Sequence, residues 1–451
     1  MGREIEELAQ FVAATQLEQI PEPVQRHAKL VVLDTLGVIL AGAERPEVRQ
    51  LRESLSATAG TGATVFARGW PTHDPRTAAF LNTLAGRSIE LGEGHRYVSY
   101  QGAMQILPGV LAVGEWAPCN GREMLAALIL GYDFGARIAA AMTTRPLAHQ
   151  NGQAALLGAA AACARVRGLN AADTSRAVRN AATLVLTPSY NNAIAGATTL
   201  NVAGGMSGFA GGLVSDLTLA GFTAQDDAIE EALSSLVGDG FEPAGLCADL
   251  GTRWEITRDW LRLRACCNPI YAALDVLEAA LAELRPRPND IERVDVATFR
   301  FAAAMRNPDP PNYFASKYSL PHAAAALVIN GSTGYGSLND AAVVDPGIAA
   351  LRHRVHITED PAMTAATPQL KPARVTLTLK DGRHCTHSCA SPRGDCLNPY
   401  AESEIREKFR ELAAPTLTPA GIAEIEHAVD RCDQWTSVGE LAALLRGHAE
   451  C

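Results

Sequence analysis

Hydrophobic residues recur at helical spacing through the first 260 or so residues of the chain. Ile5, Leu8, Phe11 and Val12 recur at helical spacing, which predicts an amphipathic helix near the N-terminus. A proline opens a second predicted helix over residues 23–42. No strand-like alternation occurs before about residue 290, so this half of the chain is predicted to be all-helical.

Alanine and glycine are frequent in the predicted helices over residues 126–142, 154–165 and 204–221. Small residues allow helices to approach each other closely, which predicts a compact helical bundle. The glycine pairs within 204–221 follow no strand, so they do not form a phosphate-binding loop.

The pattern changes near residue 291. Residues 291–299 alternate between apolar and polar, as do residues 375–379, which run into Asp381-Gly382, a typical hairpin turn. A helix is expected between these strands, over residues 318–329. Together they predict a separate α+β domain.

After this domain the sequence returns to helical spacing, over residues 403–412 and 418–429. The predicted fold class is therefore mainly α with an α+β domain. We expect a helical domain over residues 1–264, the α+β domain over 265–397, and C-terminal helices over 398–451 that pack back on the helical domain.

The chain has 451 residues, is 47% hydrophobic and 20% charged, and has a formal net charge of −10. This composition is typical of globular proteins, and the absence of a basic run argues against a nucleic-acid partner. We find no run of roughly 18 apolar residues that would span a membrane, and the acidic N-terminal segment lacks the pattern of a signal peptide. A cytoplasmic protein with no membrane partner is expected.

The ten cysteines lack the spacing of a metal site. Cys385 and Cys389, with His384 and His387 nearby, fit an alternating strand better than a zinc knuckle. The sequence therefore predicts no metal ligand. The adjacent cysteines at 266 and 267 are expected to be small buried hydrophobic residues.

The segment LDTLGVILAG at residues 33–42 resembles the MmgE/PrpD family, which includes 2-methylcitrate dehydratase, cis-aconitate decarboxylase and iminodisuccinate epimerase. Further segments resemble family blocks in the same order: 78–82, 106–115, 127–138, 219–224, 266–275, 317–331 and 391–399.

The resemblance implies a helical domain built from both ends of the chain, an inserted α+β lid, a homodimer and an active site between helical domain and lid. It also implies chemistry that removes or inverts a C–H next to a carboxylate, or releases CO2, without metal or organic cofactor. Such a site needs cations for substrate carboxylates, with an acid and a base beside the reacting carbon.

The family's first catalytic block, His-Ser-Met-Asp-Phe-Asp-Asp-Thr, aligns with residues 87–94. Glu90 and Glu93 retain two of its acids, whereas Arg87 replaces its histidine. Gln101 begins the segment that replaces a His-Pro-Ser element, and Leu200 replaces a lysine.

Other family positions fall later in the chain. Arg262 replaces a lysine, and Tyr271 replaces a histidine. His149, Lys317 and Arg393 are retained.

Glu90 and Glu93 are three residues apart, so on a helix they would share a face and form an acid/base pair. The alternative is a solvated helix end beside Arg87 and Arg96. His95 adds a group that titrates near neutral pH, with an unengaged loop histidine as the alternative.

Lys317 is one of only five lysines, and burial can lower the pKa of a lysine enough for acid/base work. Its alternative role is that of a surface lysine capping the next helix. His149 is a catalytic candidate or a core histidine. Tyr271 is a proton donor or a packing residue.

Arginines can clamp carboxylates through paired hydrogen bonds, or form structural ion pairs. The candidate substrate-binding residues are Arg262, Arg264, Tyr318, Arg393, Arg87 and Gln101.

These observations predict a cofactor-independent lyase or isomerase that abstracts a proton next to a carboxylate of a small di- or tricarboxylate-like substrate. Because the first catalytic block is altered, elimination on a different substrate or epimerisation, as by iminodisuccinate epimerase, is favoured. The alternatives are 2-methylcitrate dehydratase or cis-aconitate decarboxylase activity, and a catalytically degenerate member that binds a ligand or acts as a scaffold.

Overall fold

The computed structural model describes residues 2–448, which form two compact units. Unit 1 contains the described residues up to Tyr190, Thr199–Leu261, and those from Ala401 onward. Unit 2 contains Asn191–Thr198 and Arg262–Tyr400. The domain boundaries expected at 264/265 and 397/398 lie a few residues from these limits.

The short segment Asn191–Thr198 belongs to unit 2, although no sequence feature indicates this. The Nδ2 of Asn312 donates a hydrogen bond to the carbonyl oxygen of Gly196 at 3.1 Å. A side chain at Gly196 would collide with Asn312, because its Cβ would lie 2.3 Å from Oδ1. The contact with Asn312, which is far away in the sequence, explains why this segment belongs to unit 2, and the local sequence pattern does not predict it.

Unit 1 is mainly helical, as the periodicity predicts. Its helices are α1 (Gly2–Ala14), α2 (Glu22–Ala43), α3 (Pro46–Ser54), α4 (Pro75–Arg87), α5 (Ala103–Trp116), α6 (Gly121–Ala141), α7 (Ala154–Val166), α8 (Ala171–Ala182), α10 (Leu200–Leu219), α11 (Ala228–Glu231), α19 (Glu402–Ala413), α20 (Pro419–Asp430) and α21 (Gly439–Gly447).

The small residues of α10 let it pack closely against α4 and α7. A Cβ on Gly208 would lie 2.5 Å from Oγ1 of Thr83 and 2.8 Å from the carbonyl oxygen of Ala79. Because neither distance is possible for a real side chain, glycine is required where these two helices meet. The compact bundle predicted from alanine and glycine content is confirmed at this contact.

Unit 1 also contains three pairs of very short antiparallel strands, so the all-helical prediction was wrong in detail. With two to four residues each, these strands are too short for alternation to show in the sequence. They are β1 (Ala63–Thr64) with β2 (Thr72–His73), β3 (Gly94–His95) with β6 (Asp259–Trp260), and β4 (Met142–Thr144) with β5 (Gly238–Phe241).

By length and composition alone, α6 is long and apolar enough to cross a membrane. This helix was not identified from the sequence, because charged residues interrupt its apolar run. In its most apolar 18-residue window, 83% of the residues are buried inside the structure. Such burial is typical of the core helix of a globular protein.

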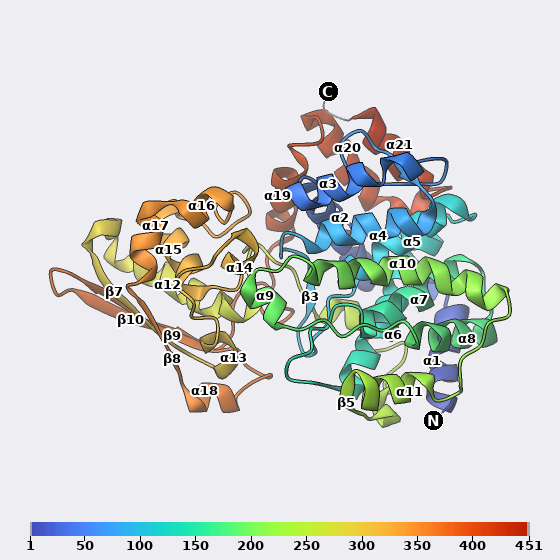
Figure 1. Cartoon of the computed structure of the whole chain (residues 1–451), viewed down its shortest axis with the longest axis horizontal. Coiled ribbons are helices and arrows are strands. Elements are labelled where there is room, and N and C mark those ends of the chain that lie inside the picture. Colours follow the sequence, from blue (N-terminus) through green and yellow to red (C-terminus); the bar gives the residue numbers. More distant parts are fainter. Residues whose placement is uncertain (1, 449–451) are drawn as a thin grey trace. The chain divides into compact units, whose positions relative to one another are not determined.

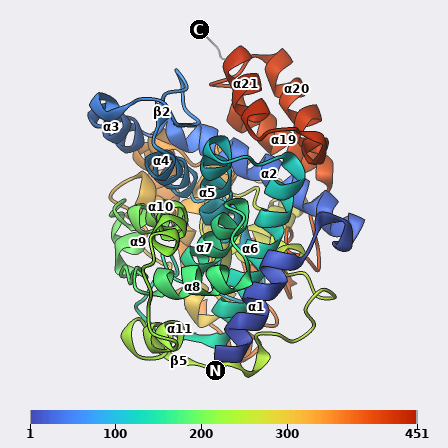
Figure 2. The same ribbon diagram turned by 90° about the vertical axis from the view of Figure 1, so that its right-hand side faces the viewer.

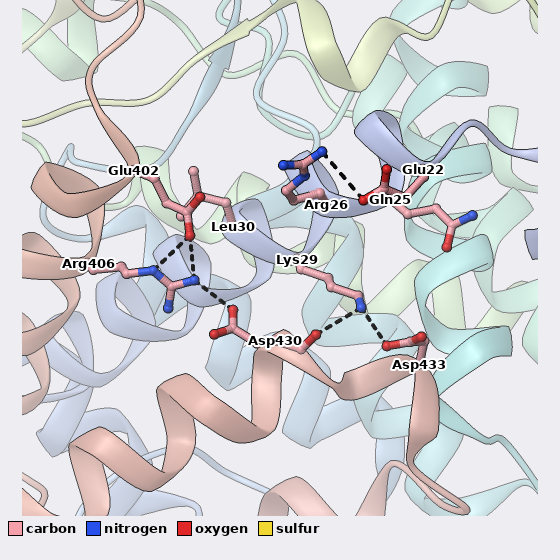
Figure 3. A pocket seen from close by; sticks show the side chains of 9 residues that line it. All are labelled: Glu22, Gln25, Arg26, Lys29, Leu30, Glu402, Arg406, Asp430 and Asp433. Carbon is pink, nitrogen blue, oxygen red and sulfur yellow. Dashed lines mark hydrogen bonds and ion pairs between the residues drawn. The ribbon is translucent and has the colours of Figure 1, made fainter.

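The C-terminal helix α19 packs on α2, as Figures 1 and 2 show. A pocket of about 410 Å³ at this contact is lined mainly by charged side chains (Figure 3). Lys29 pairs with Asp433 at 2.5 Å, and Arg406 pairs with Glu402 at 2.6 Å and with Asp430 at 2.7 Å. Because these charged side chains pair with one another, the residues that line the pocket form an ion-pair network, which joins the C-terminal helices to α2.

A buried ion pair also joins α19 to α2. The Nζ of Lys408 is 2.6 Å from Oδ1 of Asp34 and donates to the carbonyl oxygen of Leu91 at 2.9 Å. Both side chains of the pair are almost fully buried. Lys408 thus ties α19 both to α2 and to the loop that follows α4.

Lys408→Met is expected to lower the free energy of unfolding by about 3–5 kcal/mol, because it leaves the Asp34 carboxylate buried without its cation. Urea unfolding of the purified variant measures this loss. The double variant Lys408→Met/Asp34→Leu removes both charges and should recover much of the stability. A single variant as stable as the wild type would contradict this account.

Unit 2 contains a four-stranded sheet in the order β10-β9-β7-β8, with β7 and β8 parallel and the other neighbours antiparallel. The strands are β7 (Ile291–Thr298), β8 (Val355–Glu359), β9 (Ala373–Leu379) and β10 (His384–Cys389). The strand near residue 291 and the hairpin are confirmed, with Gly382 in the left-handed region at φ +88°.

Helices of unit 2 pack on this sheet: α12 contacts β9 and β10, and α15 contacts β8 (Figure 1). The helix expected at residue 318 begins instead at Leu320, because the Ser319 hydroxyl caps its first turn by accepting from the backbone N–H of His322. The helices are α9 (Asn191–Ala195), α12 (Tyr271–Leu284), α13 (Arg300–Ala303), α14 (Tyr313–Ser316), α15 (Leu320–Asn330), α16 (Asp340–Val344), α17 (Pro346–Arg352) and α18 (Pro361–Ala365). The predicted class, mainly α with an α+β domain, is confirmed.

Candidate active site

The candidate residues are divided between the two units. Those in unit 1 are Arg87, Glu90, Glu93, His95, Gln101 and His149, and those in unit 2 are Arg262, Arg264, Tyr271, Lys317, Tyr318 and Arg393.

Arg87 is the last residue of α4 and is almost fully buried. Its Nη1 donates to Oε1 of Gln101, which also accepts a hydrogen bond from Nε2 of Gln150 at 3.1 Å. A Cβ on Gly204 of α10 would lie 2.8 Å from Cγ of Arg87. Glycine at this position therefore makes room for the aliphatic part of the buried Arg87 side chain.

Glu90 lies in the turn after α4, so the prediction that it shares a helix face with Glu93 was wrong. Helix α4 ends at Arg87, and Glu90 has a left-handed backbone at φ +51°. Its Oε2 lies 3.6 Å from Nη2 of Arg87, and both side chains are buried, which also contradicts the solvated alternative. Strained backbone at a non-glycine residue is common in active sites.

Glu93 is fully buried and supports the local fold. Its Oε1 accepts a hydrogen bond from the backbone N–H of Ala103 at 2.7 Å, at the start of α5, and its Oε2 accepts from the Tyr132 hydroxyl at 2.9 Å. Burial first, and then the charge of Glu93, hold the pKa of Tyr132 well above its ordinary value. Glu93 therefore anchors α5 instead of pairing with Glu90.

His95 lies in β3 and is buried, so it is not an unengaged loop residue. Its Nε2 is 3.0 Å from Oε2 of Glu255, and its Nδ1 accepts from the backbone N–H of Tyr97 at 3.2 Å. Burial raises the pKa of Glu255, but the hydrogen bond and charge of His95 and the charge of Arg258 outweigh it, so the pKa falls to about 2.

His149 is buried and stacks on Tyr190, with ring centroids 5.4 Å apart and planes at 24°. Its Nδ1 accepts a hydrogen bond from the backbone N–H of Asn151 at 3.2 Å. An accepting Nδ1 places the proton of a neutral ring on Nε2. This tautomer could donate a proton or a hydrogen bond through Nε2.

Asn201 is a candidate that sequence reasoning missed. It is buried at the start of α10, and within the described residues neither Nδ2 nor Oδ1 has a hydrogen-bond partner. Nδ2 of Asn151 donates to the carbonyl oxygen of Leu200 at 3.3 Å, beside Asn201. Asn201 lies three residues before Gly204, which puts it on the helix face that meets Arg87. No spacing signal in the sequence identifies it.

Arg87 and Gln101, which are hydrogen-bonded to each other, and Asn201, on the α10 face that meets Arg87, all carry unused donors. In the part of the chain that the structure describes, Nε of Arg87, Nε2 of Gln101 and Nδ2 of Asn201 are buried without a hydrogen-bond partner. Burying such groups unpaired is costly, and a carboxylate is the acceptor that a guanidinium and two amides fit. We call Arg87, Glu90, Gln101, Gln150 and Asn201 the Arg87 cluster.

Lys317 of unit 2 is fully buried, which rules out a surface lysine. Its Nζ donates to the carbonyl oxygen of Leu338 and lies 4.0 Å from the ring centroid of Tyr313. The buried Tyr318 places its ring edge-on to Phe314, with centroids 5.5 Å apart.

Arg264 is buried and bound by acids of α12. Its Nη2 is 2.7 Å from Oδ1 of Asp275 and 2.7 Å from Oε2 of Glu278, and its Nη1 donates to Thr333 at 2.7 Å. The Tyr271 hydroxyl donates to the carbonyl oxygen of Arg264. Both side chains therefore make structural contacts within unit 2.

The remaining arginines of unit 2 differ in exposure. Arg262 is buried. Arg393 is more exposed, and its backbone N–H donates to Oδ2 of Asp275 at 2.7 Å while its guanidinium lies 4.8 Å from the Tyr400 ring centroid. Cys266 and Cys267 are buried, as expected.

His322 in the first turn of α15 is a second residue that sequence reasoning missed. It is fully buried, and neither ring nitrogen has a hydrogen-bond partner among the described residues. Burial, followed by the charges of Arg352 and Lys317, lowers its pKa to about 3. His322 is therefore neutral at physiological pH.

The stability of the protein is expected to fall with acidity because of His322. A histidine in the unfolded chain titrates at about pH 6.5, whereas His322 in the folded protein has its pKa lowered to about 3. Between these two pH values the unfolded state binds a proton that the folded state does not bind. The free energy of unfolding should lose up to about 1.4 kcal/mol per pH unit from this group. Urea unfolding of wild type and His322→Leu between neutral and acidic pH measures the difference. Parallel pH profiles would contradict the prediction.

Two family models match the chain: the MmgE/PrpD N-terminal domain over residues 6–236 and the MmgE/PrpD C-terminal domain over residues 265–434. Similar proteins span nearly the whole chain. A cis-aconitate decarboxylase-like protein of Aspergillus oryzae is 23% identical over 478 residues, covering 99% of this chain and 98% of the relative. The cis-aconitate decarboxylases of Aspergillus terreus (23%, covering 97% and 95%) and Homo sapiens (22%, covering 98% and 94%) are also similar.

A helical unit assembled from both ends of the chain, its buried polar cluster and these decarboxylase relatives together define a lyase-type class of enzyme. Within that class, the chain belongs to the MmgE/PrpD family. The resemblance to this family that residues 33–42 and the later segments carry is thereby confirmed.

Proposed function

We propose that the protein is a cofactor-independent enzyme that abstracts a proton next to a carboxylate of a small di- or tricarboxylate-like substrate. The observation that carries this proposal is the Arg87 cluster, in which a buried cation with unused donors lies beside a carboxylate on strained backbone. The reaction is an elimination or an epimerisation.

In this proposal Arg87, Gln101 and Asn201 bind one substrate carboxylate. Glu90 is the base, because its Oε2 lies 3.6 Å from the guanidinium that would hold that carboxylate. A C–H next to the bound carboxylate then falls within reach of Glu90. His149 is the acid on the helical unit, since its Nδ1 accepts a backbone hydrogen bond and leaves Nε2 with the proton.

The unit 2 candidates complete the proposal. Lys317 acts as a second acid or as a carboxylate ligand, and Arg262, Tyr318 and Arg393 contact substrate. Arg264 serves as a positioning residue, because acids of α12 already engage its guanidinium.

Three further residues are proposed to act as positioning residues, as Arg264 does. Glu93 holds the start of α5, and His95 pairs with Glu255. Tyr271 donates its hydroxyl proton to a backbone carbonyl. In each of these contacts the side chain binds another group of the protein. Each residue is therefore proposed to act through its neighbours instead of contacting substrate.

Decarboxylation of cis-aconitate is the second candidate reaction, because the similar proteins of Aspergillus and Homo sapiens bear that name. Dehydration of 2-methylcitrate is a third. Arg87 stands where the family block has a histidine, Gln101 begins the segment that replaces a His-Pro-Ser element, and Leu200 replaces a lysine. These replacements favour a different reaction. The protein is further proposed to act in the cytoplasm as a homodimer.

A substrate panel in D2O, followed by NMR, tests the proposal. Deuterium in an inverted product identifies an epimerase, deuterium in returned substrate with an alkene product identifies an elimination, and CO2 release identifies a decarboxylase. The panel contains cis-aconitate, 2-methylcitrate and iminodisuccinate. Binding without exchange or turnover across the panel would instead support a degenerate, ligand-binding member of the family.

A further inference from the structure

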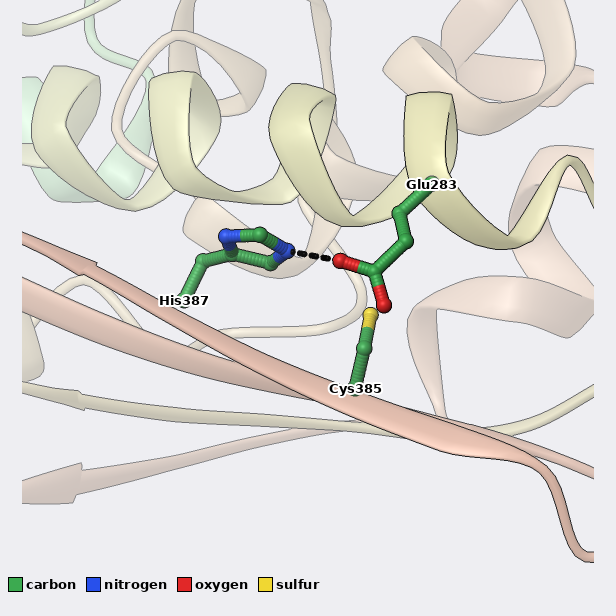
Figure 4. A group of neighbouring side chains, drawn as sticks. All are labelled: Glu283, Cys385 and His387. Carbon is green, nitrogen blue, oxygen red and sulfur yellow. Dashed lines mark hydrogen bonds and ion pairs between the residues drawn. The ribbon is translucent and has the colours of Figure 1, made fainter.

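Three side chains with metal-ligating atoms meet on one side of the sheet in unit 2 (Figure 4). They are Glu283, Cys385 and His387, and one ligand atom from each lies within 4.8 Å of the others. Nε2 of His387 is 2.7 Å from Oε2 of Glu283. Figure 4 shows the Cys385 sulfur pointing at the same carboxylate. We call these three residues the Glu283 cluster.

Local geometry explains why the residues converge. Cys385 and His387 are two positions apart on β10, so both side chains point to the same face of the sheet. Helix α12 packs on that face, and Glu283 lies in its last turn. The acid is far from the other two in sequence, which is why spacing alone predicted no metal ligand.

The ligand set fits a borderline-soft divalent cation. Zn²⁺ binds thiolate, imidazole and carboxylate at about 2.0–2.3 Å in tetrahedral geometry, so its ligand atoms stand roughly 3.3–3.6 Å apart. The cluster needs only small side-chain movements to reach this spacing. Glu283 can make them, because its side chain is 53% exposed.

The sulfur is available as a ligand. Cys385 is buried and belongs to no disulfide among the described residues, and the hydrogen bond from its Sγ to the carbonyl oxygen of Ala280 is long, at 3.8 Å. The His387 side chain is 34% exposed, which leaves solvent a route to the cluster. A cation bound here would have three protein ligands and one position for water.

We propose that the Glu283 cluster is a zinc site that fastens the last turn of α12 to the edge strand β10. None of the three residues has a role in the proposed reaction, so the inference is independent of the proposed function. The metal would stabilise unit 2, because a cation that binds only the folded state adds its binding free energy to folding.

Zinc titration of chelator-stripped protein tests the proposal, with native mass spectrometry for stoichiometry and a chromophoric chelator as competitor. One zinc per chain is expected, with a rise in melting temperature. Cys385→Ser, His387→Ala and Glu283→Gln should each weaken binding at least about 10-fold, since even outer-shell partners of metal ligands contribute about 10- to 100-fold.

Cys389→Ser is the matched control. Cys389 follows on the same face of β10, but its sulfur contacts the carbonyl oxygen of Ala272 at 3.7 Å, away from the Glu283 cluster. This variant should bind zinc as the wild type does. Cobalt substitution adds a spectroscopic readout, because a thiolate-to-cobalt band should appear in the wild type and the control but not in Cys385→Ser.

Absence of zinc binding at micromolar metal would overturn the proposal, as would wild-type affinity in the Cys385, His387 and Glu283 variants. His387→Ala and Glu283→Gln alter partly exposed side chains, so they carry the test even if Cys385→Ser fails to fold. Chelation is expected to lower the melting temperature without changing turnover. A loss of turnover that zinc restores would overturn the structural role.

Discussion

Glu90→Gln is expected to lower turnover at least about 100-fold, because a general base typically contributes about 10²- to 10⁴-fold. The variant keeps the shape of the side chain but cannot accept the substrate proton. In D2O it should therefore stop the exchange of substrate hydrogen for deuterium as well as the overall reaction. NMR of the substrate pool measures both.

Glu93→Gln is the matched control for this prediction. Both carboxylates are buried in one segment, but the oxygens of Glu93 accept from Ala103 and Tyr132. Its loss is expected to appear mainly as stability, about 1.5–3 kcal/mol for hydrogen bonds to a charged group. Equal losses of exchange in both variants, or full turnover in Glu90→Gln, would contradict the assignment of Glu90 as base.

Lys317→Met is expected to lower turnover at least about 100-fold if the buried ammonium serves the reaction as proposed. Methionine fills most of the lysine volume, so the substitution avoids the cavity that alanine would leave. The carbonyl of Leu338 loses its donor, and the free energy of unfolding should fall by about 1–3 kcal/mol. Steady-state kinetics under conditions where the variant is fully folded, with kcat and KM determined separately, distinguish the loss of turnover from the loss of stability.

Lys380→Met is the control for charge removal within unit 2, since Lys380 is exposed at the turn between β9 and β10. It should leave turnover and stability near wild type. Near-normal turnover in Lys317→Met, together with reduced stability, would show that Lys317 only supports the local fold, through its contacts with Leu338 and Tyr313.

Local pattern was sufficient for much of the fold. Helical spacing predicted α1 and α2, and period-two alternation predicted β7 and the β9–β10 hairpin, because both periodicities are properties of short segments. The return to helical spacing after residue 398 predicted α19 and α20. Strands of two residues, such as β3, carry too little pattern to be predicted.

Site residues were predictable only as residue types at family positions. Glu90 and Arg87 were named from the aligned block, and the structure brings them within 3.6 Å. Their geometry was not predictable, because it depends on where α4 ends and on the left-handed backbone at Glu90. Asn201 and His322 were missed, since an unpartnered buried side chain has no signature in a single sequence.

The sequence by itself determined the family, the mainly helical character of the first half and the place of the α+β domain. These features follow from segment order and from periodicity, which neighbouring residues set. Tertiary structure alone decided that Glu93 anchors α5, that Lys317 is buried, and that Glu283 meets Cys385 across 102 positions. Burial and long-range contact belong to the packed molecule, because they depend on which distant segments exclude water from a side chain.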